Sequence, residues 1–166
     1  GPADYLSVVT DQNIFISLYR FCLENSIPFL ALGGGTNVFF SEAGFRGLVA
    51  LIKFDKVSTV TGKAVVAEAG ASLDQIRLEC IENELSGFEF ASGIPGSIGG
   101  AVYGNAGAYG NNVGEILTRA KILTFDGQIK FVTRDFFKFS YRYSDLKKNP
   151  AFILQIELQM SRGDST

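Results

Sequence analysis

The sequence has 166 residues, 46% of them hydrophobic and 19% charged, which is enough for one compact domain or for two small lobes that share an interface. The formal net charge of −2 gives no electrostatic footprint for nucleic acid or for an anionic membrane surface. No apolar run approaches the ~20 residues of a membrane span and no signal peptide opens the chain, so we expect a cytoplasmic protein without a membrane partner.

Residues 1–54 predict a first lobe with the order β-α-β-β. A helix is expected from Thr10 or Asp11 to about Asn25, because either residue can cap it and apolar residues follow at helical spacing. Pro28 ends that pattern. The apolar face of this helix is predicted to hold Ile14, Leu18, Phe21 and Cys22. Strands are predicted at 4–9, 29–32, 38–40 and 47–52.

Residues 55–166 predict a second lobe that is rich in strands. Ser72 can cap a helix that runs to about Leu85. The dipeptide Asp126-Gly127 is typical of a β-hairpin turn. The apolar face of the helix is predicted to hold Leu73, Ile76, Cys80 and Ile81. Strands are predicted at 57–60, 64–69, 118–125, 128–133 and 152–160, and residues 161–166 look like a frayed or cut end.

The sequence contains no histidine, which excludes histidine-based acid–base catalysis, histidine metal ligands and attachment of a cofactor through histidine. Its two cysteines, Cys22 and Cys80, lie far apart and each falls on the apolar face of a predicted helix. Such cysteines are usually reduced core residues rather than a disulfide or a metal site. We therefore expect no metal site and no covalent cofactor linkage.

A first glycine-rich segment, residues 33–37, follows a predicted buried strand directly. Successive N–H groups in such a turn can converge on an anion such as a diphosphate, and Thr36 and Asn37 add side-chain hydrogen bonds. The alternative is a tight turn that only requires positive φ. The segment lacks the lysine of a Walker loop, and Val38 stands where a Rossmann fingerprint requires glycine.

A second segment, residues 93–110, consists almost wholly of small or conformationally special residues. Pro95 suits the first turn of a short helix, and the small residues after it would clear the surface of that helix. A flat aromatic ring or a diphosphate could then lie on the backbone, with hydrogen bonds from Ser97 and Asn105. The alternative is close packing of this helix against another helix or a strand.

Together these segments resemble the UDP-N-acetylenolpyruvoylglucosamine reductase family. The resemblance extends from residue 1 to about residue 160, with the motifs in the family's order and spacing. It rests on the opening residues 1–6 and on four further stretches, which are Gly33-Gly34-Gly35-Thr36-Asn37, Gly93-Ile94-Pro95-Gly96-Ser97-Ile98-Gly99-Gly100-Ala101, Asn105-Ala106-Gly107-Ala108-Tyr109-Gly110 and Phe139-Ser140-Tyr141-Arg142-Tyr143-Ser144.

The resemblance implies an α+β, two-lobed FAD-binding fold of the vanillyl-alcohol-oxidase type. Non-covalent FAD would lie between the lobes 1–54 and 55–166. Asn105, Ala106 and Gly107 would lie towards the isoalloxazine. The residues expected to hold the diphosphate and ribityl chain are Gly33, Gly34, Gly35, Thr36, Asn37, Gly93, Pro95, Gly96, Ser97, Gly99 and Gly100.

The resemblance also implies a reaction. Members of the family use NADPH to reduce FAD, and the reduced flavin then transfers a hydride to the enolpyruvyl group of UDP-N-acetylglucosamine enolpyruvate. Negative charge builds up on the carboxylate side of the substrate, where a guanidinium can grip it with two hydrogen bonds. Arg142 is in the position of the family's arginine, and Tyr141 would shape the pocket beside it. From the residues alone, a surface Tyr/Arg pair is the alternative.

The family has a third domain that supplies a serine proton donor, a glutamate and most contacts to the sugar nucleotide, and this sequence ends before it. We therefore expect a missing C-terminal domain or a second chain, and weak or no reductase activity of this chain alone. A non-catalytic flavin- or nucleotide-binding module is an alternative. A flavoprotein oxidase of the same fold is a further one, which the segment 93–110 disfavours.

Overall fold

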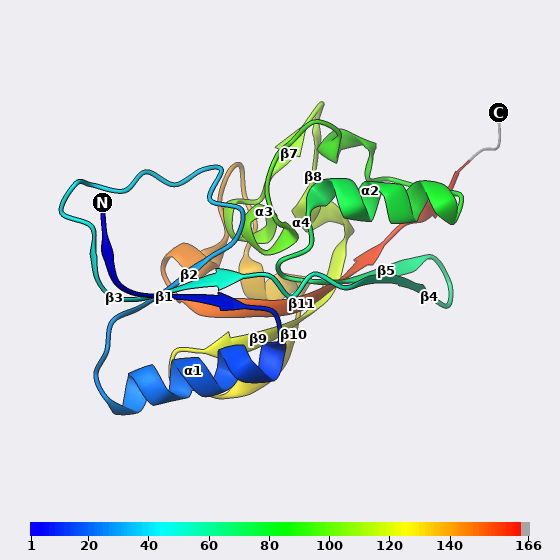
Figure 1. The fold of residues 1–166 in the computed structure, drawn as a ribbon. Coiled ribbons are helices and arrows are strands. Elements are labelled where there is room, and N and C mark those ends of the chain that lie inside the picture. Colours follow the sequence, from blue (N-terminus) through cyan, green and yellow to red (C-terminus); the bar gives the residue numbers. More distant parts are fainter. Residues whose placement is uncertain (164–166) are drawn as a thin grey trace.

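The structure is a computed structural model that describes residues 1–163. Its main elements are two β-sheets with helices on both sides (Figure 1). The helices are α1 (Gln12–Glu24), α2 (Leu73–Glu82), α3 (Ile98–Gly104) and α4 (Val113–Ile116), with short 3₁₀ turns at Glu89–Ala91, Arg134–Phe137 and Asp145–Lys147. Within the described residues, no helix is both long and apolar enough to cross a bilayer.

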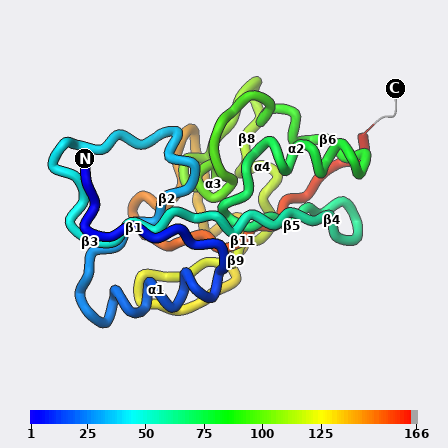
Figure 2. Tube along the Cα trace, in the orientation of Figure 1, coloured from blue at the N-terminus to red at the C-terminus, as the bar shows by residue number. Residues whose placement is uncertain are grey.

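The first sheet is parallel and three-stranded, with the order β1-β3-β2. It comprises β1 (Ala3–Val9), β2 (Phe29–Leu32) and β3 (Phe45–Ile52). Helix α1 connects β1 to β2, and Asp11 begins it by accepting hydrogen bonds from the N–H groups of Asn13 and Ile14. The long connection 33–44 between β2 and β3 starts with the glycine triplet (Figure 2).

The second sheet is antiparallel and five-stranded, with the order β10-β9-β11-β5-β4. Helix α1 lies on one side of this sheet, and α2 and α3 lie on the other (Figure 1). The Asp126-Gly127 hairpin joins β9 to β10, as the sequence predicts. The strands are β4 (Val57–Val60), β5 (Ala64–Glu68), β9 (Leu117–Thr124), β10 (Ile129–Thr133) and β11 (Ala151–Gln159).

Short two-stranded ladders complete the fold. One pairs β6 (Leu85–Ser86) with β12 (Ser161–Arg162), and the other pairs β7 (Gly107–Ala108) with β8 (Asn111–Asn112). The expectation of a frayed end from residue 161 is therefore wrong for 161–162, whose backbone is held by the 85–86 strand. Residues 164–166 lie outside the described part of the chain.

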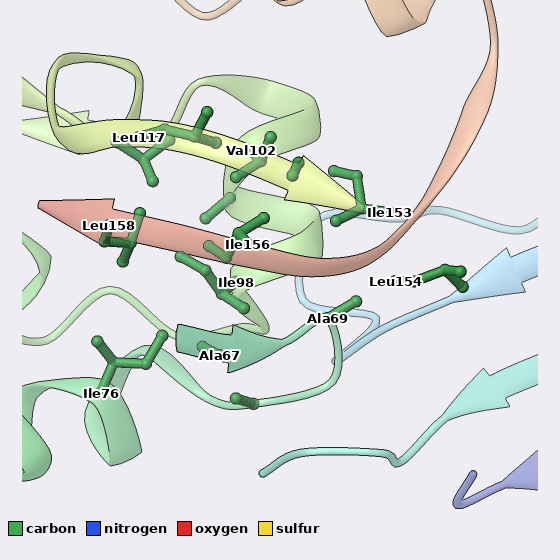
Figure 3. Close-up of a cluster of buried hydrophobic side chains, with 14 of the residues drawn as sticks. Ala67, Ala69, Ile76, Ile98, Val102, Leu117, Ile153, Leu154, Ile156 and Leu158 are labelled. Carbon is green, nitrogen blue, oxygen red and sulfur yellow. The ribbon is translucent and has the colours of Figure 1, made fainter. Parts of the chain in front are cut away.

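The core continues through both sheets and the helices on them. Ile98 and Val102 of α3 point towards β9 and β11, where they meet Leu117 and Ile156 (Figure 3). All four side chains are buried. The apolar side of α3 is thus its contact with the antiparallel sheet, and its opposite side is available to a ligand.

Aromatic side chains join α1 to the antiparallel sheet. Phe15 and Tyr19 pack edge-on against Phe152 of β11, with ring centroids 5.6 and 4.7 Å apart. Phe29 of β2 packs against the same three rings. The hydroxyl of Tyr19 donates a 2.7 Å hydrogen bond to the Phe125 carbonyl at the hairpin. This cluster fixes the parallel sheet against the antiparallel one.

The sequence-based prediction for the inner face of α1 is wrong in detail. The buried residues are Phe15, Ile16, Tyr19 and Cys22, whereas Ile14 and Phe21 are more than half exposed. Both choices keep helical spacing, but only the observed one turns the larger aromatic set towards Phe29 and Phe152. Similarly, Leu73, Ile76 and Cys80 of α2 are buried as predicted, but Ile81 is 58% exposed.

Residues 38–40 form no strand, which corrects a second expectation. Their side chains are exposed, Phe39 to 98%, and no neighbouring strand pairs with them. Apolar β-branched and aromatic residues favour a strand only where a partner strand is in reach. Both cysteines are buried and free, and burial together with the nearby Glu89 and Glu79 charges raises the pKa of Cys80 to about 11.

Replacing Phe15 by alanine is expected to lower the free energy of unfolding by about 3–5 kcal/mol, because it empties the centre of the aromatic cluster. The matched control is Phe21→Ala on the outer face of the same helix, where we expect a loss below about 1 kcal/mol. Urea denaturation of the two variants and the parent measures both values. Equal losses would contradict the orientation of α1.

Candidate functional site

The two glycine segments meet at the end of β2. A Cβ atom on Gly33 would lie 2.2 Å from the Ser97 hydroxyl, and one on Gly34 would lie 3.2 Å from the Gly96 Cα. The hydroxyl of Thr36 donates a 3.2 Å hydrogen bond to the Pro95 carbonyl. A side chain on Gly33 would displace the Ser97 hydroxyl, and one on Gly34 would press on the Gly96 backbone, so the small size of glycine allows the two segments to come this close.

The first segment offers backbone donors that the protein does not use. From Gly33 to Asn37, within the described structure, no backbone N–H donates to a protein acceptor, and the same holds for Gly96 and Ser97. Four of these residues, 34–37, are exposed. Gly35 has φ +68° and Gly96 has φ +130°, conformations that glycine adopts without strain. A run of unpaired N–H groups of this kind suits an anion such as a diphosphate.

Helix α3 starts at this junction. Ser97 caps it by accepting a 3.4 Å hydrogen bond from the Gly100 N–H. Pro95 precedes the helix instead of occupying its first turn, because Ser97 is still extended and forms a bridge to Ser72, and the helix begins only at Ile98. The Gly99 N–H donates to the Ala69 carbonyl at 3.0 Å, so Gly99 serves packing against that connection, whereas Gly100 is exposed.

Helix α3 ends at Asn105, which has φ +47° and is 5% exposed. Its side chain donates a 2.9 Å hydrogen bond to the Ser140 carbonyl and accepts one of 3.0 Å from the Gly114 N–H. Ala106 and Gly107 continue into β7, where Gly107 pairs with Asn112. The three residues expected near the isoalloxazine therefore lie at the opposite end of α3 from the glycine junction.

Arg142 lies at the tip of a tight turn. The backbones of Ser140 and Tyr143 exchange two hydrogen bonds of 3.1 Å, which leaves Tyr141 and Arg142 as the two turn residues. Arg142 has φ +53° and an exposed side chain, and Tyr141 is 91% exposed. Neither side chain has a hydrogen bond or an ion pair among the described residues, so both are free to meet a ligand.

The turn is supported from its C-terminal side by Asp145. The side chain of Asn149 donates to its carboxylate at 2.6 Å, and Tyr143 donates at 3.3 Å. These bonds, together with the charge of Lys138, hold the pKa of Asp145 below its usual value. The ammonium group of Lys147 donates to the Arg142 carbonyl at 2.8 Å. A carboxylate of lowered pKa keeps this support charged down to acid pH.

The structure thus brings the segment 33–37 together with 95–97, and it brings 105 together with the 140–144 turn. Gly93 has φ +76°, is exposed, and touches neither group. Sequence reasoning gave no role to Gly114 or Ser144. Gly114 carries no local signal, since its need for glycine comes from Phe139, whose ring would lie 2.6 Å from an added Cβ.

Comparison with known families decides the class of ligand. Residues 3–133 match the FAD binding domain family. The chain belongs to this FAD-binding family. The match covers β1 to β10, so both glycine segments and α3 lie inside it.

Curated relatives extend the match to the whole chain. The chain is 40% identical over 164 residues to the UDP-N-acetylenolpyruvoylglucosamine reductase of Caldanaerobacter subterraneus, covering 99% of this chain and 54% of the relative. It is 40% identical over 168 residues to the enzyme of that name from Streptococcus mutans, with 100% and 54% covered. The chain therefore spans about half the length of the curated relatives it matches. The resemblance seen in its motifs is confirmed.

Solved structures agree on the fold. The UDP-N-acetylenolpyruvylglucosamine reductase of Thermus caldophilus superposes with a TM-score of 0.77 at 25% identity, covering 94% of this chain and 55% of that one. A glucooligosaccharide oxidase from Acremonium strictum, which carries a cysteinyl, histidyl FAD, superposes with a TM-score of 0.73 at 17% identity and supports the fold alone. The predicted fold class is confirmed.

The residues present fit FAD at the glycine junction. The unpaired N–H groups of Gly33–Asn37 and of Gly96 and Ser97 suit a diphosphate, and the closeness of these glycines leaves the backbone bare beside α3. The chain contains no histidine, and both of its cysteines are buried in the core.

Gly33→Ala is expected to weaken FAD binding about tenfold, because the added methyl displaces the Ser97 hydroxyl beside the unpaired N–H groups. The lost cap of α3 should also destabilise the fold by about 1 kcal/mol. Gly104→Ala is the control, since a Cβ there meets nothing within 4 Å. Titration of flavin fluorescence measures the affinity. Unchanged FAD binding by the Gly33 variant would contradict the location of the site.

Proposed function

We propose that this chain is the FAD-binding part of an NADPH-dependent reductase that converts UDP-N-acetylglucosamine enolpyruvate to UDP-N-acetylmuramate in the cytoplasm, a step of peptidoglycan synthesis. The observation that carries the proposal is the arrangement around α3. A set of N–H groups without protein acceptors among the described residues lies at one end, and the Arg142 turn is bonded to the other. The names of the relatives supply the reaction class.

In this proposal, residues 1–54 and 55–166 are the two lobes that enclose the cofactor. The segments 33–37 and 93–100 hold its diphosphate and ribityl chain, and 105–107 lie towards its ring. When bound, FAD supplies hydride transfer from NADPH to the substrate. The protein's own contribution is to hold the cofactor, to keep its face bare of side chains, and to orient the substrate.

Arg142 binds the substrate carboxylate and stabilises the negative charge that develops there. A guanidinium keeps its proton at all relevant pH values and presents two parallel donors. The αL conformation of Arg142 and the bond from Lys147 to its carbonyl fix the backbone from which it extends. Tyr141 at the same tip shapes the pocket, and its exposure leaves it free to contact the substrate.

The part of the relatives beyond this chain completes the site in our proposal. It would supply the proton donor and most of the sugar-nucleotide contacts, so the chain alone should bind FAD better than it turns over. A non-catalytic flavin module is the competing proposal. In that case, replacing Arg142 would leave the function of the protein unchanged.

The first test is the absorption spectrum of the purified chain mixed with FAD. We expect flavin bands that stay with the protein on desalting and separate from it on denaturation, as non-covalent binding requires. Adding the enolpyruvyl sugar and NADPH should give little or no turnover without the remaining part of the enzyme. Turnover near that of a complete reductase would contradict the proposal that residues beyond this chain supply the proton donor and most of the sugar-nucleotide contacts.

The second test replaces Arg142 in the completed reductase. We expect Arg142→Ala to lower kcat by about 10²–10³ and Arg142→Lys to lower it less, because lysine keeps the charge but loses the paired donors. Arg77→Ala is the control, since Asp74 on the surface of α2 is the one ion-pair partner of Arg77 within the described structure. Full activity of the Arg142→Ala variant would favour the non-catalytic module.

A further inference from the structure

The described part of the chain buries three polar side chains, those of Ser97, Asn105 and Ser144, and all three touch α3. Ser97 begins the helix at the glycine junction. Asn105 ends it, and Ser144 donates a 2.7 Å hydrogen bond to the carbonyl of Tyr103 in its last turn. Burying a polar group without its hydrogen bonds costs folding free energy. Breaking any of these bonds should therefore destabilise the structure around α3.

Two of these three side chains, Asn105 and Ser144, hold the Arg142 turn from opposite sides. Asn105 donates to the carbonyl of Ser140, two residues before Arg142, at 2.9 Å. Ser144, two residues after Arg142, donates to α3 at 2.7 Å. The turn is thus attached to the C-terminal end of α3 at both of its stems. Among residues 1–163, the side chains at its tip, Tyr141 and Arg142, have no hydrogen-bond or ion-pair partner.

The Asn105 side chain also connects the turn to α4. Its carbonyl oxygen accepts the Gly114 N–H at 3.0 Å, while its amide group donates to Ser140. An added Cβ on Gly114 would lie 2.6 Å from Phe139 and 2.9 Å from the Asn105 oxygen. Phe139 stacks on the fully buried Phe137 at 5.2 Å, so the stem of the turn is packed as well as bonded.

We propose that Asn105 and Ser144 are positioning residues, which set the Arg142 turn at a fixed distance and orientation from the glycine junction through the short helix α3. This inference rests on the proposed function, since it assigns Arg142 to the substrate carboxylate. In this inference the Asn105 side chain does not contact the cofactor ring directly. Its amide and its carbonyl oxygen already bond to Ser140 and Gly114, and the residue is only 5% exposed.

The test uses two substitutions that remove one hydrogen-bond donor each. Asn105→Asp keeps the acceptor for the Gly114 N–H and tolerates the αL backbone, but it cannot donate to the Ser140 carbonyl when ionised. Ser144→Ala removes the donor to Tyr103 without adding volume. The matched control is Asn25→Asp, which changes another helix-ending asparagine on the exposed end of α1.

Amide hydrogen exchange in the FAD-loaded chain is the first measurement. We expect exchange of the Ser140 and Tyr143 amides to rise about tenfold or more in both variants and not in the control, with FAD affinity kept within about threefold. Unchanged exchange in the turn would overturn the proposal. A loss of FAD as large as that of Gly33→Ala would overturn it too, because Asn105 would then hold the cofactor.

Turnover in the completed reductase is the second measurement. Asn105→Asp should lower kcat about 10- to 100-fold, because the Arg142 guanidinium is then misplaced. In the Arg142→Ala background, adding Asn105→Asp should not lower kcat any further. Equal losses in both backgrounds would mean that Asn105 acts independently of Arg142, which overturns the proposal. A parent enzyme that leaves the enolpyruvyl sugar unreduced contradicts the proposed function instead, and the exchange result then decides the positioning alone.

Discussion

The contact between α1 and the antiparallel sheet determines where the glycine turn of β2 lies. Phe15 and Tyr19 of the helix and Phe29 of the strand surround Phe152, so the parallel sheet cannot shift along β11 without breaking this cluster. Because β2 leads directly into Gly33, the same packing brings the triplet within contact distance of Ser97. Close-packed interiors contain few voids and resist displacement, so the packing of this cluster also holds the glycine junction in place.

Helix α3 connects the glycine junction to the Arg142 turn. It is only seven residues long, and its stability comes from Ile98 and Val102 in the core and from polar groups at both ends. Ser97 at its start and Asn105 and Ser144 at its finish are buried and hydrogen-bonded. A connection of this kind relates the glycine junction, where we propose that the cofactor diphosphate binds, to the Arg142 turn.

The glycine junction and the Arg142 turn are built without a histidine or an exposed cysteine among the described residues. Both cysteines are buried in the core, and the raised pKa of Cys80 keeps that thiol protonated. What the described residues offer is backbone N–H groups, bare backbone and a guanidinium on a supported turn. These are the means to bind and orient, and they agree with a family in which the cofactor carries the redox chemistry.

Local sequence determined most of the elements and both glycine segments. Asp11, Ser72 and Asp126-Gly127 act on their own neighbours, and the glycine runs require positive φ or close approach wherever they are placed. Only the tertiary structure decided which face of α1 turns inward and that residues 38–40 lack a partner strand. It also decided that the Asn105 side chain bonds to Gly114 and Ser140. The physical reason is that these outcomes depend on residues far apart in the chain, whose packing no local pattern records.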